Sequence, residues 1–103
     1  MLVQEEHNAW LHLAASVAVV SAGVALKVSV EDWRWLVIAV ALVWVAEAIN
    51  TAVEELCDRV SPGFDPAIGR AKDLAAGGVL AASMAAAVIG VLTLGPPFLR
   101  WLG

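Results

Sequence analysis

Charge is scarce in this sequence of 103 residues: charged side chains make up 16% of the chain, and the net charge is −4. A soluble domain usually carries a charged share near ~25%. The low charged share, together with 61% hydrophobic residues, indicates a chain that is not surrounded by water alone. Because the few charges form no basic excess, the composition argues against nucleic acid as a partner.

Cysteine is scarce as well, because Cys57 is the only one. A single cysteine excludes an internal disulfide and a cysteine-based metal site. Neighbouring carboxylates at Glu54, Glu55 and Asp58 disfavour a thiolate there, so we interpret Cys57 as structural. We expect no cleavable signal peptide, because acidic rather than basic residues precede the first apolar run.

Three apolar runs, at residues 10–26, 35–53 and 74–95, approach or reach the ~20 residues that a membrane-spanning helix needs. Asp65 and Pro66 predict a capped start for the third helix, and Pro96-Pro97 predicts its end. We therefore predict one all-α membrane domain over residues 1–103, with transmembrane helices at about 9–27, 33–57 and 66–95.

Three spans would place the N-terminus and the charged loop 58–73 on one side of the membrane, and the turn 27–32 with the C-terminus on the other. Lys and Arg are equally divided between the two sides, so the positive-inside rule leaves the orientation open. The third helix is rich in alanine and glycine, which let helices approach closely. Both tight packing within one chain and a homo-oligomer contact explain this composition.

Polar residues form a stripe on the second helix at the spacing i, i+3, i+4, i+7 and i+11, which is one face at 3.6 residues per turn. Its members are Glu47, Asn50, Thr51, Glu54 and Asp58. An ionisable residue inside a span is costly and indicates a functional site. Glu47 is thus a candidate general base, with a protonated packing residue as the alternative. Asn50 would orient Glu47 or a ligand hydroxyl, or make an interhelical hydrogen bond.

Other charged residues lie where water reaches the helix ends. Glu54 and Glu6 are candidate Mg²⁺ ligands, because Mg²⁺ takes carboxylates together with phosphate oxygens; solvated carboxylates at a helix end are the alternative. Lys72 is a candidate phosphate-binding cation with Asp73 beside it, although a lysine extending toward the headgroups explains the pair equally well. We expect His12 to face the headgroups without a chemical role, and Trp44 to be a packing residue.

The motif EAINTAVE at residues 47–54, followed by Asp58 and by GRAKDL at residues 69–74, resembles the prokaryotic diacylglycerol kinase family, which includes the undecaprenol kinases. The segment around Glu6-His7-Asn8 and LHLAA at residues 11–15 is similar to the start of that family's first helix. The resemblance covers essentially the whole chain and requires no phosphate-binding P-loop.

The resemblance implies a homotrimer of three-helix protomers in the bacterial inner membrane, with sites shared between chains on the cytoplasmic side. It implies Mg²⁺-dependent transfer of phosphate from ATP to a lipid hydroxyl. Glu47 would be the base and Asn50 would support the acceptor. Glu6 and Glu54 would bind Mg²⁺ together with ATP. ATP would also contact Lys72, Asp73, Phe64 and Asp65, and the lipid would contact Asn8 and Ala76.

The family usually begins with a basic surface helix of about fifteen to twenty residues; this sequence starts almost at Glu5-Glu6, and we expect that helix to be absent or trimmed. At residues 74–79, LAAGGV has Ala76 where the diacylglycerol kinase branch tends to have serine, which favours undecaprenol slightly over diacylglycerol. Two alternatives of other classes are a small proton-coupled multidrug exporter and a non-enzymatic assembly subunit. The exporter fits poorly, because such proteins have four spans with one glutamate in the first, and the assembly subunit leaves Glu47, Asn50 and Glu54 unexplained.

Overall fold

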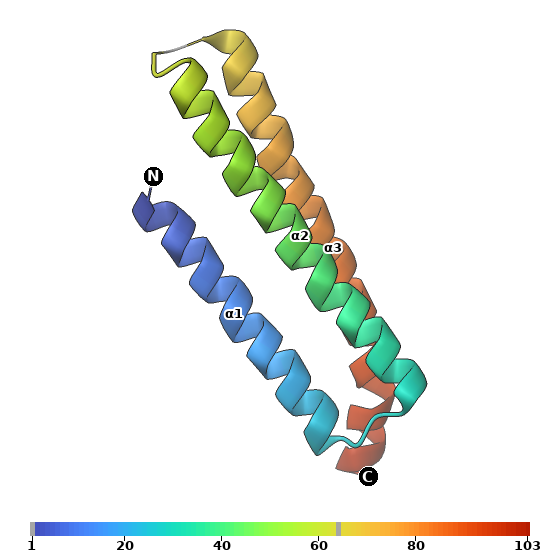
Figure 1. Ribbon diagram of the computed structural model, residues 1–103. Coiled ribbons are helices and arrows are strands. Elements are labelled where there is room, and N and C mark those ends of the chain that lie inside the picture. Colours follow the sequence, from blue (N-terminus) through green and yellow to red (C-terminus); the bar gives the residue numbers. More distant parts are fainter. Residues whose placement is uncertain (1, 64) are drawn as a thin grey trace.

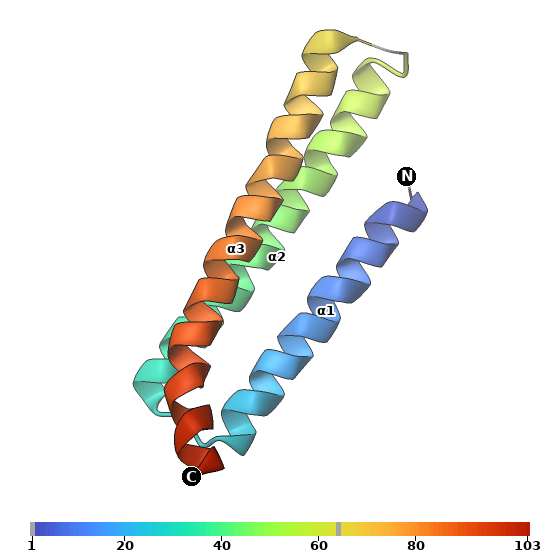
Figure 2. The same ribbon diagram turned by 180° about the vertical axis from the view of Figure 1, so that it is seen from behind.

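The computed structural model describes residues 2–63 and 65–103, with side chains described from residue 9 onward, and this part of the chain is entirely helical. Helix α1 runs from Leu2 to Ala25, α2 from Val30 to Val60 and α3 from Pro66 to Leu102. α2 and α3 lie side by side along their lengths, while α1 diverges from them toward its N-terminus (Figures 1 and 2). The predicted all-α class is confirmed.

A tight turn makes α1 and α2 antiparallel neighbours, as the short polar segment predicted (Figure 1). Lys27, in the turn after α1, has φ of 53°, a left-handed backbone conformation. Ser29 caps α2 by accepting a hydrogen bond from the Asp32 backbone N–H. Close by, the Trp33 ring lies against Gly23, where an added Cβ would come within 2.7 Å of the ring. Gly23 therefore allows the close approach of the two helices next to the turn.

The boundaries of the first two helices differ from the prediction. α1 begins at Leu2 rather than near residue 9, and α2 extends from Val30 to Val60 rather than over 33–57. α3 begins at Pro66 as predicted, with the Asp65 side chain accepting from the Ala67 backbone N–H.

The predicted helix end at Pro96-Pro97 is wrong, because α3 continues through both prolines to Leu102. A proline removes one backbone donor and crowds the carbonyl four residues earlier. The two prolines therefore leave the carbonyls of Leu92 and Thr93 without their usual helical donors, and α3 ends about two turns later. Pro97 is buried, so packing also holds this segment in place.

Large apolar side chains point outward along much of the helical bundle. Val37, Leu80 and Val91 are 62%, 63% and 70% exposed, whereas the fully buried core contains Leu36 and the small Ala39 and Ala82. A water-soluble bundle would place its apolar stripe inward and polar residues outward. α2 and α3 are each long and apolar enough to cross a membrane, and Ala9–Ala25 forms a shorter apolar helix. These features indicate a membrane protein.

Candidate functional site between the three helices

The polar stripe of α2 forms one continuous inward face, as its spacing predicted. Glu47 and Asn50 are buried, with 6% and 7% of their surface exposed, and Glu54 and Asp58 are half-buried nearer the α2–α3 loop. Burial thus decreases along the stripe from mid-helix toward the loop. A carboxylate and an amide buried this deeply in an apolar bundle need polar partners.

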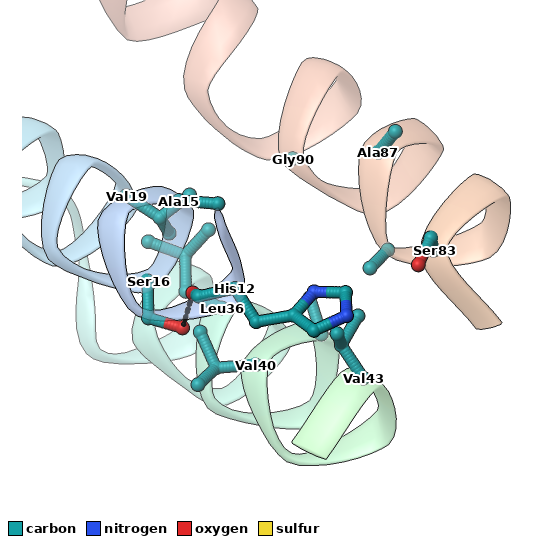
Figure 3. A pocket seen from close by; sticks show the side chains of 12 residues that line it. His12, Ala15, Ser16, Val19, Leu36, Val40, Val43, Ser83, Ala87 and Gly90 are labelled. Carbon is teal, nitrogen blue, oxygen red and sulfur yellow. Dashed lines mark hydrogen bonds between the residues drawn. The ribbon is translucent and has the colours of Figure 1, made fainter. Parts of the chain in front are cut away.

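The partner of Glu47 is His12 on α1, whose Nε2 lies 3.2 Å from Glu47 Oε2. His12 was expected to face the headgroups without a role, and this expectation is wrong: its side chain is mostly buried and its ring points into the space between the helices (Figure 3). The contact joins α1 to α2 at the depth of the polar stripe. The hydrogen bond that the packing alternative required for Glu47 is therefore present, and it is made by an ionisable side chain.

Ser16 and Trp44 surround the histidine. Ser16 Oγ donates to the backbone carbonyl of His12 at 2.7 Å, and the Trp44 indole Nε1 donates to Ser16 Oγ at 2.9 Å. The rings of His12 and Trp44 also meet edge to face, with centroids 6.2 Å apart. Trp44 packs as predicted, and it adds a hydrogen bond that the sequence did not indicate.

Asn50 presents an acceptor without a donor. Its Oδ1 is buried and has no hydrogen-bond partner within the described residues. Leaving such an atom unpaired costs ~1–3 kcal/mol, and native structures seldom tolerate that without a functional reason. One helical turn from Glu47, this atom is suited to accept a hydrogen bond from a ligand hydroxyl or amide.

Charged residues gather where the stripe reaches the loop. Lys72, just before the uncharged run that starts at Leu74, donates a hydrogen bond to Asp58 Oδ1. This bond raises the pKa of Lys72 above its usual value, against a smaller opposing effect of desolvation, so the ammonium form is favoured. Lys72 is half-buried and Asp73 is exposed, as expected for neighbours about 100° apart on a helix.

The remaining predicted site residues are either exposed or have side chains that lie outside the described part of the chain. Asp65 is exposed and its carboxylate caps α3, while Ala76 is exposed on α3. Phe64 and the side chains of Glu6 and Asn8 lie outside the described residues. Among the described residues no group of three or more His, Cys, Asp or Glu side chains is arranged to hold a metal ion. Glu54 is the one predicted Mg²⁺ ligand whose side chain is described.

An apolar cavity of about 290 Å³ continues the α2 face on the side away from the loop (Figure 3). From α2 it is lined by residues that extend the spacing of the polar stripe toward the other end of the helix, namely Leu36, Ala39, Val40 and Val43. α1 adds His12 and Ser16, and α3 adds small residues that include Ala86 and Gly90. His12 thus touches both the cavity and Glu47.

One face of α2 therefore joins three zones: an apolar cavity, a buried carboxylate–histidine pair, and a charged end beside the loop. This order suits a membrane protein that acts on a polar group at the end of a hydrocarbon chain. It favours a membrane protein whose ligand is an amphiphile.

Comparison with known proteins specifies the class. A family model described as prokaryotic diacylglycerol kinase matches residues 1–94, and the chain belongs to this family of lipid kinases. The undecaprenol kinase of Bacillus subtilis (strain 168) is 31% identical over 87 residues, which cover 84% of this chain and 71% of that protein. No solved structure matches the chain.

The diacylglycerol kinase of Synechocystis sp. (strain ATCC 27184 / PCC 6803 / Kazusa) is 35% identical over 95 residues, which are 91% of this chain. The aligned region spans about half of that relative, 54% of its length. The predicted enzyme class, a lipid kinase, is confirmed, and the exporter and the assembly subunit find no support.

Sequence reasoning did not identify His12, Ser16 and Trp44 as parts of the site. The signal was present: His12 and Ser16 are polar interruptions of an apolar helix at the spacing i, i+4, which places them on one face. Pairing that face with the stripe of α2 would have brought His12 toward Glu47 or its neighbours. The Asp58–Lys72 pair was also missed, since the two residues lie on different helices.

Proposed function

We propose that the chain transfers the γ-phosphate of ATP to the hydroxyl group of a membrane lipid in a Mg²⁺-dependent reaction. The observation that carries the proposal is the position of Glu47, buried between an apolar cavity and a stripe that becomes charged toward the loop. The hydrocarbon of the acceptor would occupy the cavity, and its hydroxyl would lie at Glu47. The nucleotide would lie at the charged end.

Glu47 is suited to be the general base. Its carboxylate would take the hydroxyl proton as the lipid oxygen bonds to the γ-phosphorus and the bond from that phosphorus to the β–γ bridging oxygen breaks, which releases ADP. The unpaired Asn50 Oδ1 would accept a hydrogen bond from a polar group of the acceptor, such as a second hydroxyl or the reacting hydroxyl before it loses its proton. Burial excludes competing water from the base, which limits hydrolysis of ATP.

The charged end fits a nucleotide with its metal ion. Glu54 offers hard carboxylate oxygens on the same face as Glu47, and Lys72 supplies a cation stabilised by Asp58. Mg²⁺ needs only one or two protein carboxylates when phosphate oxygens complete its shell, so Glu54 with Glu6 would suffice. Bound Mg²⁺ would neutralise charge on the phosphates. Lys72, Asp73, Phe64 and Asp65 would contact ATP.

We further propose three membrane spans, with the N-terminus and the α2–α3 loop on the cytoplasmic side of the bacterial inner membrane, because ATP is available there. A homotrimer with sites shared between protomers would cover the open faces of α3. Arg70, Asp73, Leu74 and Gly77 share one such face, and an added Cβ at Gly77 meets nothing within 4 Å. Small residues of this kind let a second helix approach closely in a membrane.

Undecaprenol is the favoured acceptor, with diacylglycerol as the second candidate. The preference rests on Ala76 and its neighbours, with Asn8 and Glu47 as further lipid contacts. ATP consumption in mixed micelles that contain either lipid tests both the activity and the preference. Phosphorylation of neither lipid, by a chain that is folded and inserted, would contradict the proposed function.

A further inference from the structure

Three side chains from two helices fix the place of one imidazole ring. Trp44 on α2 donates its indole N–H to Ser16 on α1, and Ser16 in turn donates to the His12 carbonyl. The Trp44 ring meets the His12 ring directly, edge to face. The histidine is thus held from its backbone and from the side of its ring, and its Nε2 is directed at Glu47 Oε2.

The contact between His12 and Glu47 involves one of the two carboxylate oxygens. His12 Nε2 lies 3.2 Å from Oε2, and within the described residues His12 is the one hydrogen-bond partner of this carboxylate. A neutral imidazole carries one N–H, and a carboxylate accepts only, so with Glu47 ionised as a base the contact would place the proton on Nε2. The bond occupies Oε2 and leaves the lone pairs of Oε1 for another proton.

A glutamate side chain is otherwise hard to aim. It has several rotamers, and holding it in one of them costs conformational entropy. A base works only within hydrogen-bond reach of the proton that it takes, and a displacement of ~1 Å can slow a reaction about 10²-fold. A fixed donor on a second helix supplies the orientation that the α2 backbone alone does not.

We propose that His12 is a positioning residue for the base: it holds Glu47 Oε2 so that Oε1 faces the acceptor hydroxyl, and Ser16 and Trp44 hold His12 in turn. This inference rests on the proposed function, because it requires Glu47 to be the base. It assigns His12 no contact with ATP and no share of the metal site.

Kinetics of the full chain in mixed micelles with undecaprenol test the proposal. His12→Ala should lower kcat about 10- to 100-fold, a larger factor than any change in the KM for the lipid, whose chain would lie against His12 in the cavity. The KM for ATP should stay within about twofold, because the nucleotide would lie at the charged end. His12→Gln places an amide N–H near the position of Nε2 and should restore most of the lost kcat. In a Glu47→Gln background, His12→Ala should cause little further loss, because the group to be positioned is gone.

The supporting residues give matched controls. Ser16→Ala removes both hydrogen bonds of the Ser16 hydroxyl, and Trp44→Phe removes the one that the indole donates. Each variant should lower kcat by a small factor, and the two factors should not multiply in the double variant, because the variants share the Trp44–Ser16 bond. Ser21→Ala, at an exposed position on the same helix, should have no effect. If His12→Ala fails to insert or fold, His12→Gln and Trp44→Phe still decide the matter.

A measurement without turnover complements the kinetics. The chain has two histidines, so His7→Gln leaves His12 as the one source of imidazole ¹⁵N resonances in micelles. These should indicate a proton on Nε2 and should shift when Glu47 becomes glutamine. A proton on Nδ1, or resonances that do not respond, would overturn the inference.

The kinetic outcomes separate this inference from the proposed function. Normal turnover of Glu47→Gln would refute the base assignment and the inference with it. An inactive Glu47→Gln chain beside a fully active His12→Ala chain would refute only the role of His12. Equal losses in His12→Ala and His12→Gln, or a change confined to KM, would show that the donor N–H does not orient the base.

Discussion

Filling the cavity between the three helices should weaken acceptor binding without slowing chemistry. Ala86 and Gly90 line the cavity from α3. Ala86→Leu adds three carbons toward it, while Gly90→Ala adds one, and an added Cβ at Gly90 meets nothing within 4 Å. Each added carbon would fill space in this cavity of about 290 Å³ that a methylene group of a bound chain would otherwise occupy.

The expected size follows from the burial of hydrocarbon, at ~0.8 kcal/mol per methylene group. Ala86→Leu would then cost about 2.4 kcal/mol, roughly a 50-fold increase in the acceptor KM, and Gly90→Ala about fourfold, since ~1.4 kcal/mol corresponds to tenfold. kcat at saturating lipid should be unchanged, because Glu47 and His12 are untouched. These values are upper limits, because methylene groups displaced from the cavity can contact membrane lipid instead.

The assay measures initial rates at increasing mole fractions of undecaprenol in micelles at saturating ATP. Ala85→Leu is the matched control, since Ala85 precedes Ala86 but is exposed and does not line the cavity. A short-chain alcohol acceptor, too short to fill the cavity, should show little difference between variants. An unchanged KM in folded Ala86→Leu, or an equal rise in Ala85→Leu, would show that the acceptor chain lies elsewhere.

Three further results are expected. Glu47→Gln should lower turnover by at least ~10²-fold while the assembly stays intact by size-exclusion chromatography, because glutamine cannot take the proton; near-normal turnover would remove Glu47 from the mechanism. Glu6→Ala and Glu54→Ala should each need far more Mg²⁺ to reach the maximal rate, and unchanged titrations would make them ordinary solvated carboxylates. Mixing inactive Glu47→Gln and Glu54→Ala chains should restore part of the activity if one site draws these residues from two protomers; co-purified mixed oligomers without activity would exclude that sharing.

The helices and the inward face of α2 were predictable because they depend on local spacing. Glu47, Asn50 and Glu54 recur at intervals that fix one helix face, and Asp65-Pro66 fixes the start of α3 through capping chemistry. Resemblance of the same residues to a lipid kinase family then gave the enzyme class, which the family model confirmed. These inferences need no knowledge of how the helices are placed relative to one another.

Contacts between helices were the part that sequence reasoning missed. His12 and Glu47 are 35 positions apart, and no local rule states which face of α1 meets α2. The end of α3 was missed for another reason, since proline was treated as a stop, whereas α3 continues through both prolines to Leu102 with Pro97 buried. The roles of all the predicted site residues stay predictions, and the side chains of Glu6, Asn8 and Phe64 lie outside the described residues.

The continuous face of α2 has a consequence for how deep in the membrane phosphate transfer would occur. Glu47 and Glu54 are seven residues apart on one helix, which at 1.5 Å per residue separates their backbones by about 10 Å along the axis. Where Glu47 and Glu54 of one helix serve the same site, the number of residues between them would set the distance from the lipid hydroxyl to the nucleotide phosphates, because a helix is stiff along its axis. A one-residue insertion between them would rotate Glu54 by about 100°, out of register with the base, while a deletion or insertion in the α2–α3 loop would leave that distance unchanged.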